Sequence, residues 1–156
     1  MGLLSDKKGL IMGVANERSI AWGIAKACSS QGAKLAFTYQ GEALKKRIVP
    51  LAESIGSDFT LECDVADQSA IKDTFDKIKK KWNGIDFLVH AIGFSDKNEL
   101  KGEFYNTTKE NFNRTMLISS FSLTEISREA QHLMDKNGGS ISVSYTHLTL
   151  PTKCWV

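Results

Sequence analysis

The 156 residues suit a single domain. A formal net charge of +2 at pH 7 is too small to indicate nucleic acid or an anionic membrane as a partner, and no apolar run approaches the ~20 residues of a membrane-spanning helix. Hydrophobic residues make up 42% of the chain and its first residues carry no secretion signal, so we expect a cytoplasmic protein.

The first elements alternate between apolar runs and amphipathic stretches. The apolar run at 9–14 predicts a buried strand, and 19–31 predict a helix that ends at Gly32. A second strand is predicted at 34–39, with a second helix following at 42–55.

The middle of the chain continues this alternation. Pro50 should kink or interrupt the second helix, because proline lacks the N–H that the helix needs. A third strand is predicted at 59–63. Asp67 is placed to cap a helix that runs to Trp82, whose apolar residues recur at helical spacing. A fourth strand is predicted at 85–91.

The last elements follow a polar loop at 95–106. Thr107 or Thr108 can cap a long helix that we expect to run to about Met134 and to close at Gly138–Gly139. Ser140–Ile141 start a fifth strand. Continuously apolar strands separated by amphipathic helices predict an α/β fold with a doubly wound, Rossmann-like parallel sheet. Such sheets bind ligands beyond the carboxyl ends of their strands.

The turn after the first strand has the composition of an anion-binding site. Gly13 lets the backbone pass close to a ligand, Ala15 keeps that approach open, and Ser19 can cap the helix or offer its hydroxyl to a phosphate. Gly23 is expected to allow tight packing of the helix on the first strand. The alternative is a plain loop with a serine cap and a helix glycine, without any ligand.

The segment Gly13–Ala25 reads G-V-A-N-x-x-S-I-A-x-G-I-A and resembles the variant cofactor turn of bacterial enoyl-acyl-carrier-protein reductases. These enzymes are divergent members of the short-chain dehydrogenase/reductase superfamily. The resemblance runs from about Leu4 to Ile141 and includes Cys63–Val65, His90–Phe94 and Phe112–Ser119. It implies that residues 1–141 form an incomplete dinucleotide-binding domain.

The resemblance also implies a set of cofactor contacts. Gln40 would lie beside the adenosine, Asp64 would hold the adenine amino group, Val65 would form a wall, and Ile92 and Gly93 would pass the ribose and nicotinamide. The complete set of expected contacts is Gly13, Ala15, Ser19, Ile20, Gln40, Asp64, Val65, Ile92 and Gly93. Alternatively, Gln40 is a solvated turn residue and Asp64 only starts a turn.

Two further expectations concern the same end of the sheet. No arginine immediately follows Gln40 to receive a 2′-phosphate, which favours NADH over NADPH. Ser95 stands near the position where family members contact substrate through the backbone, although a plain loop residue is the alternative.

His90 is interpreted as a packed strand residue rather than a catalyst. The three cysteines Cys28, Cys63 and Cys154 have no short metal-ligand spacing, so no metal is expected.

The implied reaction is the reduction of a trans-2-enoyl thioester, held on acyl carrier protein, with NADH in fatty-acid biosynthesis. The family's catalytic tyrosine and the lysine that follows it after six residues belong beyond the fifth strand, where this sequence has no such pair. We therefore assign no catalytic residue and expect the chain itself to be inactive. A non-catalytic NAD-binding module, or a reductase of a small alcohol or sugar, are the alternatives.

The resemblance stops abruptly after Ile141. Val143–Leu148 instead resembles the translation of a transposase sequencing adapter. Residues 142–156 are therefore expected to be a non-native tail, and Tyr145 is not interpreted as an active-site tyrosine. A chain cut here should expose its fourth and fifth strands and be marginally stable. The parent protein is expected to be a homotetramer.

Overall fold

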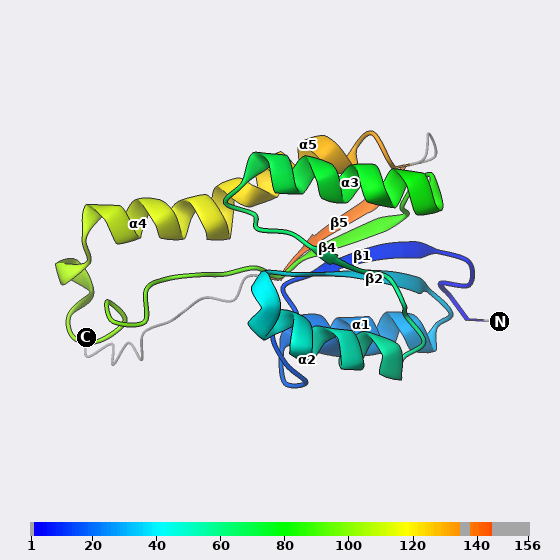
Figure 1. Ribbon diagram of the computed structural model, residues 1–156, viewed down its shortest axis with the longest axis horizontal. Helices are drawn as coiled ribbons and strands as arrows, with labels where there is room; N and C mark the ends of the chain where they lie inside the picture. Colours follow the sequence, from blue (N-terminus) through cyan, green and yellow to red (C-terminus); the bar gives the residue numbers. More distant parts are fainter. Residues whose placement is uncertain (1, 135–137, 145–156) are drawn as a thin grey trace.

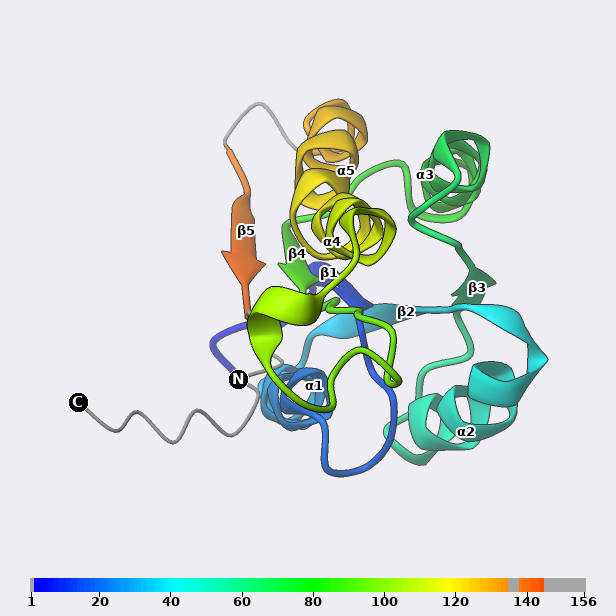
Figure 2. The ribbon, with the colours of Figure 1, turned by 90° about the vertical axis from the view of Figure 1, so that its left-hand side faces the viewer.

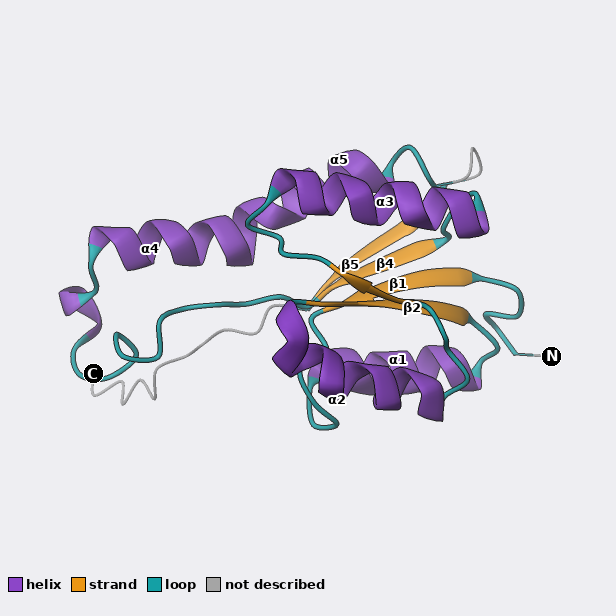
Figure 3. Cartoon of the chain, in the orientation of Figure 1, coloured by secondary structure: helices purple, strands orange, loops and turns teal. Residues whose placement is uncertain are grey.

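The computed structural model describes residues 2–134 and 138–144. Five parallel strands form one sheet in the order β3-β2-β1-β4-β5. Helices α1 and α2 cover one face, whereas α3 and α5 cover the other (Figures 1 and 3). This is the doubly wound α/β fold that the alternating pattern predicts.

The elements follow the predicted order. The strands are β1 (Lys8–Met12), β2 (Lys34–Tyr39), β3 (Thr60–Glu62), β4 (Phe87–His90) and β5 (Ser140–Val143). The helical segments are α1 (Ile20–Ser30), α2 (Gly41–Ser54), α3 (Gln68–Trp82), the 3-10 helix η1 (Phe104–Asn106), α4 (Lys109–Met116), the π-helix η2 (Leu117–Phe121) and α5 (Ser122–Ala130). The first strand ends two residues earlier than predicted, since Val14 already belongs to the turn.

The core lies on both faces of the sheet, because successive strand side chains point to opposite faces. Leu10 and Met12 of β1 pack in the same cluster as Phe75 and Ile126, from α3 and α5. Ile11, between them, packs in the cluster on the α1 and α2 side. Complete burial of such side chains contributes about 1.5–3 kcal/mol each.

The long helix predicted to about Met134 is not one regular helix. It consists of α4, the π-helical segment η2 and α5, which ends at Ala130. Its N-terminal part, α4, extends past the carboxyl ends of the strands (Figure 1). The extra residue in a π turn leaves the hydrophobic pattern nearly helical, which is why the pattern predicts a single helix.

Two other predictions about helices are wrong. Pro50 does not interrupt α2, which continues through it to Ser54. The residue is exposed, so a carbonyl freed by the missing N–H can be solvated. Gly23 does not permit tight packing on β1, because a Cβ there would meet no heavy atom within 4 Å.

The edge of the sheet beside β4 carries β5, whose four residues are all exposed (Figure 2). The prediction that the fifth strand is exposed is therefore confirmed. The expected exposure of the fourth strand is wrong, because Leu88, Val89 and His90 are at most 2% exposed between the two helical layers. β5 spans the boundary proposed at Ile141, and Val143 remains in register with His90.

Candidate functional site

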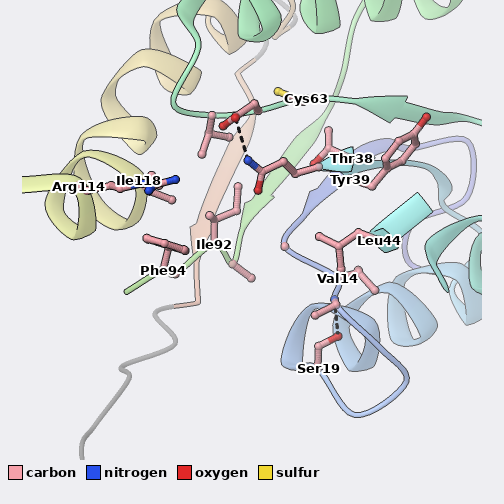
Figure 4. Close-up of a pocket in the computed structure, with 17 residues that line it drawn as sticks. Val14, Ser19, Thr38, Tyr39, Leu44, Cys63, Ile92, Phe94, Arg114 and Ile118 are labelled. Atoms are coloured by element: carbon pink, nitrogen blue, oxygen red, sulfur yellow. Dashed lines mark hydrogen bonds between the residues drawn. The ribbon is translucent and has the colours of Figure 1, made fainter. Parts of the chain in front are cut away.

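A cavity of about 350 Å³ opens at the carboxyl ends of the strands (Figure 4). Ten residues were expected at this end of the sheet. Eight of them line the cavity: Gly13, Ala15, Ser19, Gln40, Asp64, Val65, Ile92 and Gly93. Ile20 and Ser95 do not line it. The sheet thus brings together side chains that are far apart in sequence.

Nine lining residues were not predicted as contacts. They are Val14, Thr38, Tyr39, Leu44, Cys63, Ala91, Phe94, Arg114 and Ile118. Most neighbour a predicted contact in the sequence, which is a signal that could have found them. Thr38 and Leu44 lie two and four residues from Gln40. Arg114 and Ile118 are far from any predicted contact in sequence, although they lie within the stretch Phe112–Ser119 that carries part of the resemblance.

The turn after β1 is shaped by a close approach to the end of β4. Gly13 has φ of +96°, and a Cβ at this position would lie 2.0 Å from the carbonyl oxygen of Ala91. Both facts require glycine. The neighbour that excludes a side chain is therefore the protein's own backbone, whereas the sequence suggested only the path of a ligand.

Helix α1 presents its amino end to this turn. Ser19 is the N-cap residue but makes no side-chain cap bond; its hydroxyl instead donates to the Asn16 carbonyl at 2.6 Å and accepts from the Ala15 amide at 3.4 Å. Within the described part of the chain, the amides of Ile20 and Ala21 have no hydrogen-bond acceptor. Free amides and the helix dipole together favour an anion here.

Ile20 contributes to this end through its backbone. Its side chain is 54% exposed and lies outside the cavity lining. The only group that Ile20 can offer to a ligand at the turn is therefore its free amide.

Gln40 and Asp64 join the ends of β2 and β3. The Gln40 amide nitrogen donates to Asp64 Oδ2 at 2.8 Å (Figure 4). Asp64 Oδ1 accepts from the Ala66 amide at 2.9 Å, as expected of a turn-starting aspartate. Both carboxylate oxygens keep lone pairs, so Asp64 can accept a further donor from a ligand while it holds the turn.

The chain after β4 is held against the π-helical segment. Ser119 Oγ accepts from the Phe94 amide at 3.0 Å and donates to the Phe94 carbonyl at 3.2 Å. Ser119 is 8% exposed. These two bonds fix the backbone beside Ile92 and Gly93, so η2 serves as a support for one wall of the cavity.

Ser95 belongs to a polar network behind that wall. Its hydroxyl lies 3.1 Å from Asn111 Nδ2 and 3.2 Å from Thr115 Oγ1. Farther along the loop, the Glu99 carboxylate accepts from the Thr108 amide at 2.8 Å. The Thr108 hydrogen bonds hold the pKa of Glu99 below its usual value. Ser95 therefore anchors the loop to α4, and a substrate role for it stays a prediction.

His90 is the packed strand residue that the sequence suggested. It is 1% exposed, and its Nε2 lies 2.8 Å from Ser122 Oγ. The Ser122 hydroxyl donates its one proton to the Ile118 carbonyl at 2.7 Å, so His90 Nε2 carries the proton of the first bond. Burial lowers the pKa of His90, which keeps the ring neutral.

The Cys63 residue is a buried part of the cavity wall next to Asp64 in the chain. Cys63 is 4% exposed, and burial raises the pKa of its thiol. The thiolate is the nucleophilic form, so this cysteine is a packing residue. Cys154 lies outside the described residues.

The groups around the cavity fit a dinucleotide. Free amides at the start of α1 suit a diphosphate. The Gln40–Asp64 pair supplies hydrogen-bonding groups, and the walls formed by Val65, Ile92 and Ile118 are apolar. This is the usual composition of a cofactor site, with mostly apolar walls and a few polar groups that fix orientation.

Comparison with known proteins decides the family. A family model described as enoyl-(acyl carrier protein) reductase matches residues 13–153. The chain belongs to this family. The resemblance stated from the cofactor turn is therefore confirmed. The match also enters the segment 142–156, so the boundary at Ile141 stays a prediction.

Individual relatives agree with this assignment. The chain is 58% identical over 144 residues to enoyl-[acyl-carrier-protein] reductase [NADH] 2 of Rhizobium meliloti (strain 1021), covering 92% of this chain and 54% of that protein. It thus spans about half the length of the curated relatives it matches.

Solved structures of the family have the same fold. FabI from Candidatus Liberibacter asiaticus gives a TM-score of 0.88 at 54% identity, over 92% of this chain and 55% of that one. The enoyl-acyl-carrier-protein reductase of Anaplasma phagocytophilum, solved in complex with NAD, gives 0.86 at 50% identity, over 92% and 55%. Within the described ranges, no helix of our chain has both the length and the apolar character needed to span a bilayer.

Proposed function

We propose that this chain is an NADH-binding unit whose cofactor lies across the carboxyl ends of β1 to β4. The observation that carries this proposal is the meeting of eight expected contact residues around one cavity, at the free amino end of α1. Gly13, Ala15 and the Ile20 amide would face the diphosphate. Gln40, Asp64 and Val65 would hold the adenosine, and Ile92 and Gly93 would pass close to the ribose and nicotinamide.

The whole protein would then reduce trans-2-enoyl-acyl-carrier-protein to acyl-acyl-carrier-protein in fatty-acid biosynthesis. NADH, when bound, supplies a hydride to the β-carbon of the enoyl thioester. The part of the protein described here would bind and orient the dinucleotide and shield it from water between β4 and η2. This activity is supported by eight relatives that are all named enoyl-[acyl-carrier-protein] reductase [NADH]. They are 44–58% identical to this chain over 143–146 residues.

A non-catalytic NAD-binding chain is the second candidate. It is favoured by one observation: no tyrosine followed seven positions later by lysine occurs after β5 in the sequence. Such a pair is what the family resemblance places there for the proton chemistry. The alternative of a reductase for small alcohols or sugars receives no support from the relatives, which act on enoyl-acyl-carrier-protein by name.

The natural continuation of the gene separates the two candidates. We expect genomic DNA beyond the Ile141 codon to encode a Tyr-x6-Lys pair in place of residues 142–156. The protein made with that continuation should oxidise NADH, followed by its absorbance, when supplied with a crotonyl thioester. A continuation without the pair, together with no NADH oxidation, would favour the non-catalytic candidate.

The remaining proposals concern the setting of the whole protein. Acyl carrier protein is its proposed partner, a homotetramer its proposed assembly and the cytoplasm its proposed location. The relatives' names support the first of these, because they specify an acyl-carrier-protein substrate. Residues 142–156 are proposed to be a non-native tail on the basis of their resemblance to adapter sequence.

A further inference from the structure

The cavity has one cationic side chain that no expected contact explains. Among the described residues that line it, only Asp64 and Arg114 carry charge. The Asp64 carboxylate is bonded to Gln40 and to the Ala66 amide. Arg114 comes from α4 and makes no ion pair within residues 2–134 and 138–144. A guanidinium that lines a cavity without a carboxylate partner is free to meet a ligand.

Arg114 is nevertheless held in place. Its guanidinium carbon lies 4.9 Å from the centroid of the Phe94 ring, a distance typical of a cation–π contact. The Phe94 backbone is itself clamped by both bonds from Ser119. The guanidinium therefore has the Phe94 ring on one side, and Arg114 as a whole remains exposed.

The position of Arg114 indicates which part of a dinucleotide it would meet. In Figure 4, Arg114 and Ile118 lie on the opposite side of the cavity from Val14 and Ser19, which belong to the diphosphate end. Arg114 comes from α4 and Ile118 from η2. The adenosine end, marked by Asp64 and Val65, follows β3, whereas the diphosphate end follows β1.

We propose that Arg114 is a base-recognition residue: its free face stacks on the adenine of the dinucleotide, so that the guanidinium lies between that base and Phe94. This inference rests on the proposed NADH site. Arginine suits the role because its planar, weakly hydrated cation stacks on aromatic systems, whereas the lysine ammonium is a compact and strongly hydrated charge. Stacking of bases on arginine planes is a recurring form of recognition.

Fluorescence titration of NADH against the whole 156-residue chain tests the proposal. We expect Arg114→Met to weaken NADH binding by roughly 3- to 10-fold. Arg114→Lys should weaken it almost as much, since it keeps the charge but loses the planar face. Arg128→Met is the matched control, because Arg128 is an exposed arginine of α5 outside the cavity lining and its loss should change nothing.

Competition by partial ligands identifies the group that Arg114 meets. The inhibition constant of adenosine, calculated with the NADH Kd of each chain, should rise in Arg114→Met, whereas the inhibition constant of pyrophosphate should be equal in both chains. Wild-type affinity in Arg114→Lys, or loss of pyrophosphate competition in Arg114→Met, would reveal a simple charge contact and overturn the proposal, as would unchanged binding in both variants. Absence of NADH binding by the unaltered chain would instead refute the proposed function and this inference together.

Discussion

Gly13 lines the candidate site, and the backbone around it leaves no space for a Cβ atom. Its φ of +96° would strain any other residue, and the Ala91 carbonyl oxygen would lie 2.0 Å from a Cβ at this position. We expect Gly13→Ala to lower the free energy of unfolding by more than the ~1–2 kcal/mol of left-handed strain alone, as measured by urea denaturation. Gly41→Ala is the control, because Gly41 has φ of +69° but open space around a Cβ. Equal losses in the two variants would contradict the close approach.

Asp64 is the residue whose carboxylate the proposed adenine contact needs. Asp64→Asn replaces one acceptor oxygen with a donor, so we expect it to weaken NADH binding by about 1.5–3 kcal/mol, the worth of a hydrogen bond to a charged group. Isothermal titration of NADH measures this loss. Asp73→Asn, an exposed carboxylate of α3, should leave the affinity unchanged. Full affinity in Asp64→Asn would remove Asp64 from the site.

The sequence could predict the contacts that follow strands, since their positions depend only on where each apolar run ends. It could not predict Arg114, which reaches the cavity because the Ser119 hydroxyl clamps Phe94 and the Phe94 ring holds the guanidinium. That arrangement depends on three segments meeting in space. The sequence also could not reveal that the Ser19 hydroxyl bonds backward to Asn16 instead of capping α1.

At the scale of elements, α1 contains a glycine that the fold does not require. Gly23 is exposed, and a Cβ there would meet open space. Because glycine in a helix interior is less favourable than alanine, we expect Gly23→Ala to raise the free energy of unfolding by about 0.5–1 kcal/mol. Thermal or urea denaturation checks this expectation. A loss of stability would show that this face of α1 packs against something after all.

The α3 cap could be predicted from the local sequence pattern, whereas the interruption of the long helix could not. Asp67 accepts from the Ser69 amide at 2.8 Å, as an acidic residue before an amphipathic run predicts. The π turn at Leu117–Phe121 has no equally local signal. It places Ser119 and Ser122 in hydrogen bonds with Phe94 and His90, respectively, which are contacts between segments far apart in the sequence.

For the whole molecule, stability should depend on the buried His90. Burial lowers its pKa in the folded state, whereas in the unfolded chain it titrates near 6.5. The stabilising contribution is thus complete above about pH 6.5 and is lost as the pH falls, because only the unfolded chain gains the proton. We expect the free energy of unfolding to decline as the pH falls below about 6.5.

The control for this pH dependence is His90→Gln, which removes the titrating ring but keeps a donor for Ser122. The carboxylate of Asp86, which pairs with Lys7, does not affect the comparison. Partial burial raises its pKa, but the hydrogen bonds from Lys7 and Lys8 outweigh this and lower it. Asp86 therefore titrates well below the pH range in which histidine titrates. An equal decline in His90→Gln over the same range would show that another group is responsible.

The doubly wound sheet aligns strand ends from most of the chain around one cavity, and the central claim is that a dinucleotide occupies it. A crystal structure of the chain grown with excess NADH tests this claim most directly. We predict the diphosphate against the Ile20 and Ala21 amides and the adenine beside Asp64. A cavity that stays empty under these conditions, or a dinucleotide bound away from the α1 amino end, would contradict it.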